Sequence, residues 1–334
     1  MASLLPNSRL FRSVDPFLVL LIAMVALASL LPARGEAAIW VEWAADFGIA
    51  LLFFLHGARL SRAAIAQSIG NWRLHGLVFA STYVLFPIAG LAVMWLAGPW
   101  INPLLLTGLL FLTLLPSTVQ SSIAFTAVAG GNVAAAVTSA SLSNLIGIVL
   151  TPLLVGLFMK AGGGGGLSGW ASIESIVLQL LVPFAGGHLL RPLIGPWVER
   201  NRKILQPVDR GSILLVVYSA FSAAVVNGIW SRVDAVDLVE LLVLSSAILA
   251  FIMGATMLAA RVFNLPREDG IVLLFCGSKK SLVSGVPMAG ALFAPAQVGL
   301  VVLPLMIFHQ LQLFVCAVLA ARFRKQIEAG RSPD

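Results

Sequence analysis

Long apolar segments recur along almost the whole chain and limit what it can fold into. Residues 16–31, "PFLVLLIAMVALASLL", carry no charge, and similar runs follow one another to the end of the sequence. Overall, 59% of the residues are hydrophobic and only 10% are charged. An α-helix needs about 20 apolar residues to cross the hydrocarbon core of a bilayer, and it satisfies its own backbone polar groups there. The sequence therefore predicts an all-α polytopic membrane protein.

Apolar runs separated by charged residues or Gly/Pro clusters predict ten transmembrane helices. The predicted segments are 16–33, 40–60, 74–97, 103–129, 133–159, 172–193, 209–230, 237–262, 268–294 and 297–322. The first has basic residues before it and so resembles a signal peptide, but further apolar segments follow at once, which favours a retained first helix.

The basic residues fall mainly on one side of the predicted membrane. With the N-terminus inside, sixteen Lys and Arg lie in the inner connections and three in the outer ones. The inner set is Arg9, Arg12, Arg59, Arg62, Arg73, Arg191, Arg200, Arg202, Lys203, Arg210, Arg261, Arg267, Arg322, Arg324, Lys325 and Arg331. The outer set is Arg34, Lys160 and Arg232. This bias predicts cytoplasmic N- and C-termini. Because most Lys and Arg sit in short connections between apolar runs, the net charge of +7 reflects membrane topology, and we expect no nucleic-acid partner.

The chain divides near its middle into two similar halves. Residues 1–160 form a predicted five-helix repeat, 161–170 a Gly-rich linker, 171–325 a second repeat, and 326–334 a cytoplasmic tail. "GLLFLTLLPSTVQSSIAF" in segment four and "GIVLLFCGSKKSLVSGVP" in segment nine both change from apolar to small and polar residues near mid-membrane. An odd number of helices per half requires opposite orientations, and matched interrupted helices in inverted repeats indicate a transporter site at the midplane.

The polar residues at these two interruptions are the candidate binding residues. Pro116 removes a backbone donor in segment four, which leaves carbonyl groups in need of partners. The candidates are Ser117, Thr118, Gln120, Ser121 and Ser122 in segment four, and Ser278, Lys279, Lys280, Ser281 and Ser284 in segment nine. The alternative is that the small residues only allow close helix packing.

Lys279 and Lys280 are the most costly of these residues, because a charge at the bilayer centre costs about 3 kcal/mol on insertion scales. Neighbouring helical residues point about 100° apart, so we expect at most one lysine to face a central cavity. Lys280 shares a face with Ser284 and is the preferred site residue, while Lys279 is expected to pair with carbonyls at the helix break. The alternative is a purely structural lysine.

His309 lies in the middle of segment ten and is a further candidate, although a lone intramembrane His more often serves as a packing hydrogen-bonder. The sequence has no HExxH, CxxC, Walker or GxSxG motif. We therefore expect neither an enzyme nor a bound cofactor. Cys276 and Cys316 both lie in apolar segments, where a structural disulfide is not expected.

Several stretches resemble the bile acid:sodium symporter superfamily, and its bacterial bile-acid-symporter-like branch in particular. They are "LFFLHGARLS", "GGNVAAAVTSASLSNLIGIVLTPLL" and "GSKKSLVSGVPMA". The resemblance implies a core domain of helices three to five and eight to ten and a panel domain of helices one, two, six and seven. It also implies that helices four and nine are broken and cross, that two sodium ions bind there, and that organic anions are transported by alternating access.

The residues at the positions that the resemblance assigns to sodium differ from the family's pattern. Ser121 and Ser122 match a Ser-Asn pair and Thr82 matches a Gln, so Thr82 joins the candidates. Ala136 and Ala140 match a Ser and a Thr, Gly277 lies near a Glu, and Lys280 and Ser281 lie near a Gln-Asn pair. A weak sodium site at Ser121 and Ser122 is the one metal site left, and we expect a lysine to act as a tethered cation in place of sodium.

These observations predict a secondary active transporter of a small organic anion in the bilayer of a bacterial inner membrane. We expect its transport to be indifferent to sodium, with the proton as the other possible coupling ion. The alternative is a membrane regulator or channel-like protein that affects ion flux. A monomer is consistent with the sequence, which does not fix the oligomeric state.

Overall fold

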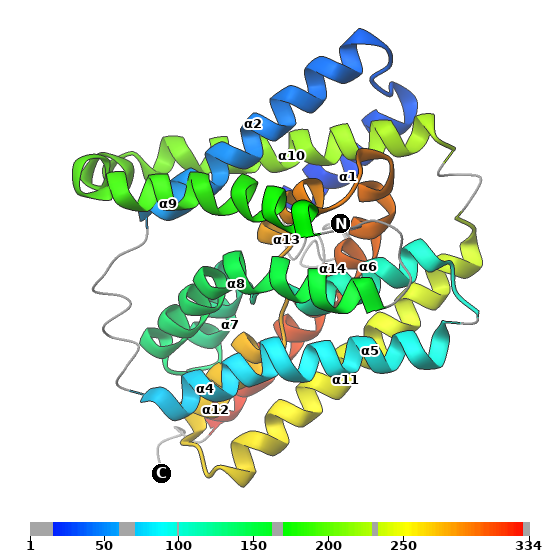
Figure 1. Cartoon of the computed structure of the whole chain (residues 1–334). Helices are drawn as coiled ribbons and strands as arrows, with labels where there is room; N and C mark the ends of the chain where they lie inside the picture. Colours follow the sequence, from blue (N-terminus) through cyan, green and yellow to red (C-terminus); the bar gives the residue numbers. More distant parts are fainter. Residues whose placement is uncertain (1–15, 60–70, 99, 162–169, 229–232, 330–334) are drawn as a thin grey trace, which may run out of the picture.

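The computed structural model describes residues 16–59, 71–98, 100–161, 170–228 and 233–329. Regular structure in these residues is entirely helical, which confirms the all-α prediction for them (Figure 1). The first half contains α1 (Pro16–Leu30), α2 (Glu36–Arg59), α4 (Trp72–Ala80), the π-helical turn η3 (Ser81–Leu85), α5 (Phe86–Ala97), α6 (Pro103–Leu114), α7 (Gln120–Val128) and α8 (Val133–Ala161). The second half contains α9 (Trp170–Arg200), α10 (Arg202–Val226), α11 (Ala235–Val262), α12 (Arg267–Gly277), α13 (Leu282–Leu292) and α14 (Pro295–Ala329).

Within the described residues, seven helical stretches are long and apolar enough to cross a membrane. Two of them are composite: Trp72–Ala97 includes η3, and Arg267–Leu292 includes the interruption between α12 and α13. Two shorter apolar helices, Val19–Leu30 and Pro103–Leu114, accompany them. The chain is therefore a polytopic membrane protein by length and composition, while the count of ten crossings and the inverted repeat stay predictions.

The helix boundaries differ from the predicted segments mainly at helix ends and at the interruptions. Segments 103–129 and 268–294 each contain two helices, and α9 and α14 continue several residues beyond the predicted apolar runs. The charged residues at these ends lie outside the apolar runs, but their side chains are compatible with a helix, so the helix continues through them. Most of the Gly-rich linker, at 162–169, and the end of the tail, at 330–334, lie outside the described residues.

Four helices form one layer of the molecule. Helices α1, α2, α9 and α10 pack against one another, and they lie across the upper part of Figure 1. The layer meets the rest of the molecule where α2, α9 and α10 contact α13, where α10 contacts α14 and where α9 contacts α8. Of the interrupted helices, α13 therefore lies next to this layer, while α12 lies against α4 and α11 farther from it (Figure 1).

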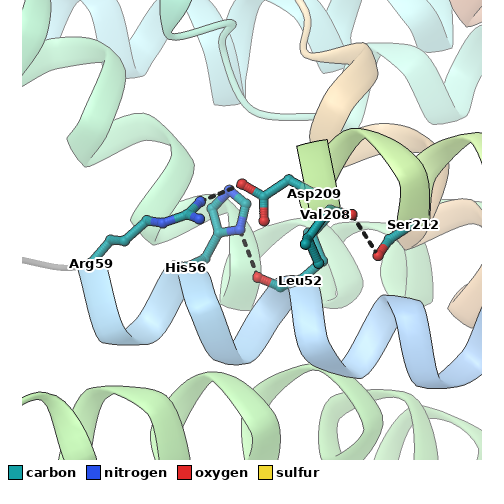
Figure 2. A network of polar contacts seen from close by, with 6 residues as sticks. All are labelled: Leu52, His56, Arg59, Val208, Asp209 and Ser212. Atoms are coloured by element: carbon teal, nitrogen blue, oxygen red, sulfur yellow. Dashed lines mark hydrogen bonds and ion pairs between the residues drawn. The ribbon is translucent and has the colours of Figure 1, made fainter. Parts of the chain in front are cut away.

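Glycines bring α2 and α9 into backbone contact. A Cβ atom placed on Gly187 would lie 1.9 Å from the carbonyl oxygen of Phe54, and one placed on Gly57 would lie 2.0 Å from that of Phe184. No side chain fits such spaces, so small residues allow the close approach. In the same layer, α2 and α10 are joined by the ion pair of Arg59 and Asp209, beside His56 (Figure 2).

We expect Gly187→Ala to destabilise the fold by about 3 kcal/mol or more, because the added methyl group would overlap a main-chain oxygen rather than a flexible side chain. Gly186→Ala is the matched control, since its Cβ would meet only one atom, Phe54 Cδ2, at 4.0 Å. Both changes bring the same gain in helix propensity. The measurement is the unfolding temperature in detergent, and equal temperatures for the two variants would contradict the contact.

Candidate functional site

The two helix interruptions cross each other and are joined by hydrogen bonds. The first interruption occurs at Leu115, because the proline that follows it, Pro116, disfavours the helical conformation there. Leu115 is extended, with φ −76° and ψ 158°. In the second, Ser281 leaves the helical conformation and its side chain caps α13 by accepting the Ser284 N–H. The backbone N–H of Ser281 donates to the carbonyl of Pro116 at 2.9 Å. The two interruptions thus supply hydrogen-bond partners for part of each other's backbone.

Three hydroxyl groups of the first interruption and α7 donate to main-chain carbonyls of the second. Ser117 Oγ donates to Cys276 O at 2.5 Å, Thr118 Oγ1 to Lys280 O at 2.8 Å and Ser122 Oγ to Phe275 O at 2.9 Å. All three hydroxyl residues are buried. The carbonyls of Phe275 and Cys276 lie in the last turn of α12, which leaves them without intrahelical partners, and that of Lys280 lies in the interruption itself.

Lys280 lies at the centre of this crossing. Its side chain is fully buried, and Nζ donates to the carbonyl oxygens of Thr82 at 2.8 Å, Thr113 at 2.8 Å and Leu115 at 2.7 Å. These carbonyls come from η3 and from the end of α6. An ammonium group has three N–H donors, so all of its donors have partners. The Phe86 ring lies 4.1 Å from Nζ and adds a cation–π contact.

The backbone of Lys280 is held by Gln312 on α14. Lys280 N donates to Gln312 Oε1 at 2.8 Å, and Gln312 Nε2 donates to Lys280 O at 2.9 Å. The candidate His309 lies one turn away, and its Nδ1 is 2.9 Å from Gln312 Nε2. His309 therefore contacts the residue that holds the backbone of Lys280.

Lys279 is equally buried but has a different environment. Its Nζ lies 4.1 Å from the centre of the Phe125 ring and 5.6 Å from that of Phe275. Its hydrogen-bond contact is a long one, 3.5 Å, to Ser121 Oγ. In this structure Lys280, not Lys279 as expected, binds the carbonyls at the helix break. That one of the two lysines faces a central cavity stays a prediction.

The remaining candidates lie either close to the crossing or at the start of α7. Ser284 Oγ donates to Asn144 Oδ1 at 2.6 Å, next to Ser281. Asn144 also donates to the carbonyl of Ser117 at 2.7 Å and so joins α8 to both interruptions. Ser278 Oγ donates to Leu274 O within its own helix. Gln120 is exposed at the start of α7, and Ser121 beside it is half-buried.

Asn144 and Gln312 were missing from the predicted site. Both are polar residues in the middle of long apolar helices, which is the signal that could have identified them. Thr82 was predicted through its side chain, but its hydroxyl donates to Val78 O within the same helix. The carbonyl of Thr82 is the group that reaches the crossing.

Two positions on α8 are assigned to sodium ligands by the resemblance. Both carry apolar side chains and have apolar surroundings. Ala136 and Ala140 are fully buried in a cluster with Leu74, Val78 and Cys276. These side chains supply no oxygen ligand, whereas sodium is bound by oxygen. The main-chain carbonyls that could bind a cation at this depth instead surround the Lys280 ammonium group.

A family model described as "SBF-like CPA transporter family (DUF4137)" matches residues 15–325. "Putative symporter YfeH" of Escherichia coli (strain K12) is 53% identical over 320 residues, which cover 96% of each chain. "Sodium/bile acid cotransporter 7-B" of Xenopus laevis is 28% identical over 338 residues, covering 95% of this chain and 96% of the relative. "Sodium/bile acid cotransporter 7" of Mus musculus is 28% identical over 318 residues, covering 91% of this chain and 90% of the relative.

We expect Lys280→Met to be less stable than Lys279→Met by about 3 kcal/mol or more, because each buried carbonyl left without a donor costs roughly 1–3 kcal/mol. Both variants remove one intramembrane charge, so the gain in insertion energy of about 3 kcal/mol is common to them. The measurement is the unfolding temperature of each purified variant in the same detergent. Equal stability of the two would show that the three carbonyls do not depend on Lys280.

Proposed function

Because the chain belongs to the SBF-like CPA transporter family, we propose that it is a secondary transporter that moves small organic anions across the membrane by alternating access. Relatives named as a symporter and as a sodium/bile acid cotransporter support the assignment to transporters. The bias of basic residues supports cytoplasmic termini, and we place the protein in a bacterial inner membrane.

The observation that carries the proposal is the cation built into the crossing of two interrupted helices. In transporters with broken helices, unwound carbonyls and the ends of half-helices coordinate the coupling cation. Here Thr113 and Leu115 present carbonyls from the C-terminal end of α6, where the helix dipole is negative, to the ammonium group of Lys280. Lys280 is thus a tethered cation in the position that a free cation would occupy.

The anion is held by Lys279 rather than Lys280 in this proposal. Lys280 uses all three of its donors on carbonyls, whereas Lys279 has one long contact, to Ser121 Oγ. Ser121 lies in the first turn of α7, whose N-terminal end carries partial positive charge. A carboxylate between Lys279 and the start of α7 would receive charge-assisted hydrogen bonds from both.

Access to this position requires a change of conformation. Lys279 is fully buried, while Gln120 and Ser121 at the start of α7 are at least partly exposed. Displacement of Phe125 and Phe275 from the ammonium group would open the route from that exposed end. Such opening and closing around a fixed site is what alternating access requires.

We expect Lys279→Met to abolish uptake of organic anions into proteoliposomes while leaving the folded yield near that of the parent, because it removes the anion's partner without exposing carbonyls. Lys279→Arg should restore little, since the planar guanidinium does not fit the space of a compact ammonium between two rings. The measurement is initial uptake of labelled organic anions, including a bile acid. Full activity in Lys279→Met would exclude it as the anion contact, and single-channel currents without saturable uptake would favour the channel-like alternative.

We expect uptake by the parent protein to be the same in sodium and in choline buffers at equal pH, because the tethered cation replaces the ion. A proton gradient is then the driving force to be tested. If sodium does increase uptake, the variants Thr82→Ala, Ser121→Ala and Ser122→Ala should reduce that increase, and the tethered-cation mechanism would be wrong.

A further inference from the structure

A cleft lies between α11, α12 and α14, apart from the helix crossing. Its volume is about 530 Å³. Arg261, Asn264 and Arg267 line its polar part, and Met257, Leu274 and Phe323 are among the residues that line its apolar part. The cleft therefore combines two guanidinium groups with a hydrocarbon wall.

The two arginines give the lining of the cleft a positive charge. The residues that line it include no Asp or Glu. Arg267 makes one long hydrogen bond, 3.4 Å, from Nη2 to the carbonyl of Phe323. The neighbouring Asp269 directs its two carboxylate oxygens to Asn71 and Asn132, at 2.9 and 3.0 Å. Both arginine side chains are exposed, so an anion can reach them.

The apolar part of the cleft adjoins exposed apolar side chains of α11. Met257 is 41% exposed, and Leu258 and Val262 on the same helix are 61% and 64% exposed. In a helix of this length and composition, exposed aliphatic side chains contact acyl chains. A soluble anion would gain nothing from this wall, whereas a molecule with a charged head and a hydrocarbon tail would contact both parts.

We propose that this cleft binds an anionic membrane phospholipid, with its phosphate at Arg261 and Arg267 and an acyl chain along Met257 and Leu274. Both arginines belong to the inner set of basic residues, and basic pockets between membrane helices on that side bind anionic headgroups. Arginine forms paired hydrogen bonds with phosphate oxygens.

The bound lipid would lie close to the lysine pair. Phe323 contacts Phe275 edge-on at 6.4 Å between ring centres, and Phe275 lies 5.6 Å from Lys279 Nζ. Occupancy of the cleft would restrain Phe323, and with it one of the two rings beside Lys279. The lipid site itself does not depend on the transport proposal, because its residues and its test are separate.

The experiment measures binding of phosphatidylglycerol to the purified, delipidated full-length protein by native mass spectrometry and by thermal shift in detergent. Phosphatidylcholine and inorganic phosphate are the comparison ligands. The test variant is Arg261→Gln/Arg267→Gln. The matched control is Arg200→Gln/Arg202→Gln, which removes two exposed arginines of the same inner set at the α9–α10 connection. A third variant, Ala260→Leu, keeps both charges and narrows the cleft.

We expect phosphatidylglycerol to bind the parent more tightly than phosphatidylcholine and to lose about thirtyfold in affinity in the test variant, from roughly 1 kcal/mol for each arginine. The control should bind as the parent does, and Ala260→Leu should lose the lipid despite its unchanged charge. Equal binding of the two lipids, full binding in the test variant, or an equal loss in the control would overturn the proposal. The same thermal shift with inorganic phosphate alone would also overturn it, and if the test variant does not fold, undiminished binding by Ala260→Leu decides against it.

Discussion

Backbone polar groups in hydrocarbon must find partners inside the protein, and this requirement governs the centre of the molecule. A continuous helix meets it unaided, but the interruptions at 115–119 and 278–281 leave N–H and C=O groups without partners in their own helices. Hydroxyl groups of Ser117, Thr118 and Ser122 satisfy three of the carbonyls, and a direct backbone bond joins Ser281 to Pro116. The crossing is stable in lipid because the two interruptions satisfy each other.

The ammonium group of Lys280 belongs to the same set of partners. It binds three carbonyls at once, which no neutral side chain can do with a single atom. Those carbonyls and the Phe86 ring offset part of its desolvation cost, and the ammonium group in turn gives the carbonyls hydrogen-bond donors. Lys279, one residue away and beside the Phe125 ring, donates among the described residues only a long hydrogen bond to Ser121 Oγ. Two identical neighbours in the sequence thus have different chemical roles.

The sequence predicted the all-helical class and the position of both interruptions, because apolar length and Pro116 act locally. It also selected most of the side chains that meet at the crossing. It did not predict which lysine binds carbonyls, because the helical face shared with Ser284 ends where the helix ends, at Gly277. Nor could a side-chain pattern identify the carbonyls of Thr82, Thr113 and Leu115, since every residue has one. Asn144 and Gln312 were missed because each follows other polar residues, Ser143 in one case and Gln310 in the other, and the sequence does not distinguish between them.

The π-helical turn at Ser81–Leu85 shows how a membrane helix can supply a backbone carbonyl to such a site. The N–H of Phe86 bonds to the carbonyl of Ser81, five residues back, so this turn holds one residue more than an α-helical turn would. The carbonyl of Thr82, within that turn, points to Lys280. In an α-helix the N–H of Phe86 would bond to the carbonyl of Thr82, four residues back, so the π-helical turn leaves that carbonyl free for Lys280. One additional residue in a membrane helix is thus enough to turn a backbone carbonyl into a ligand of the site.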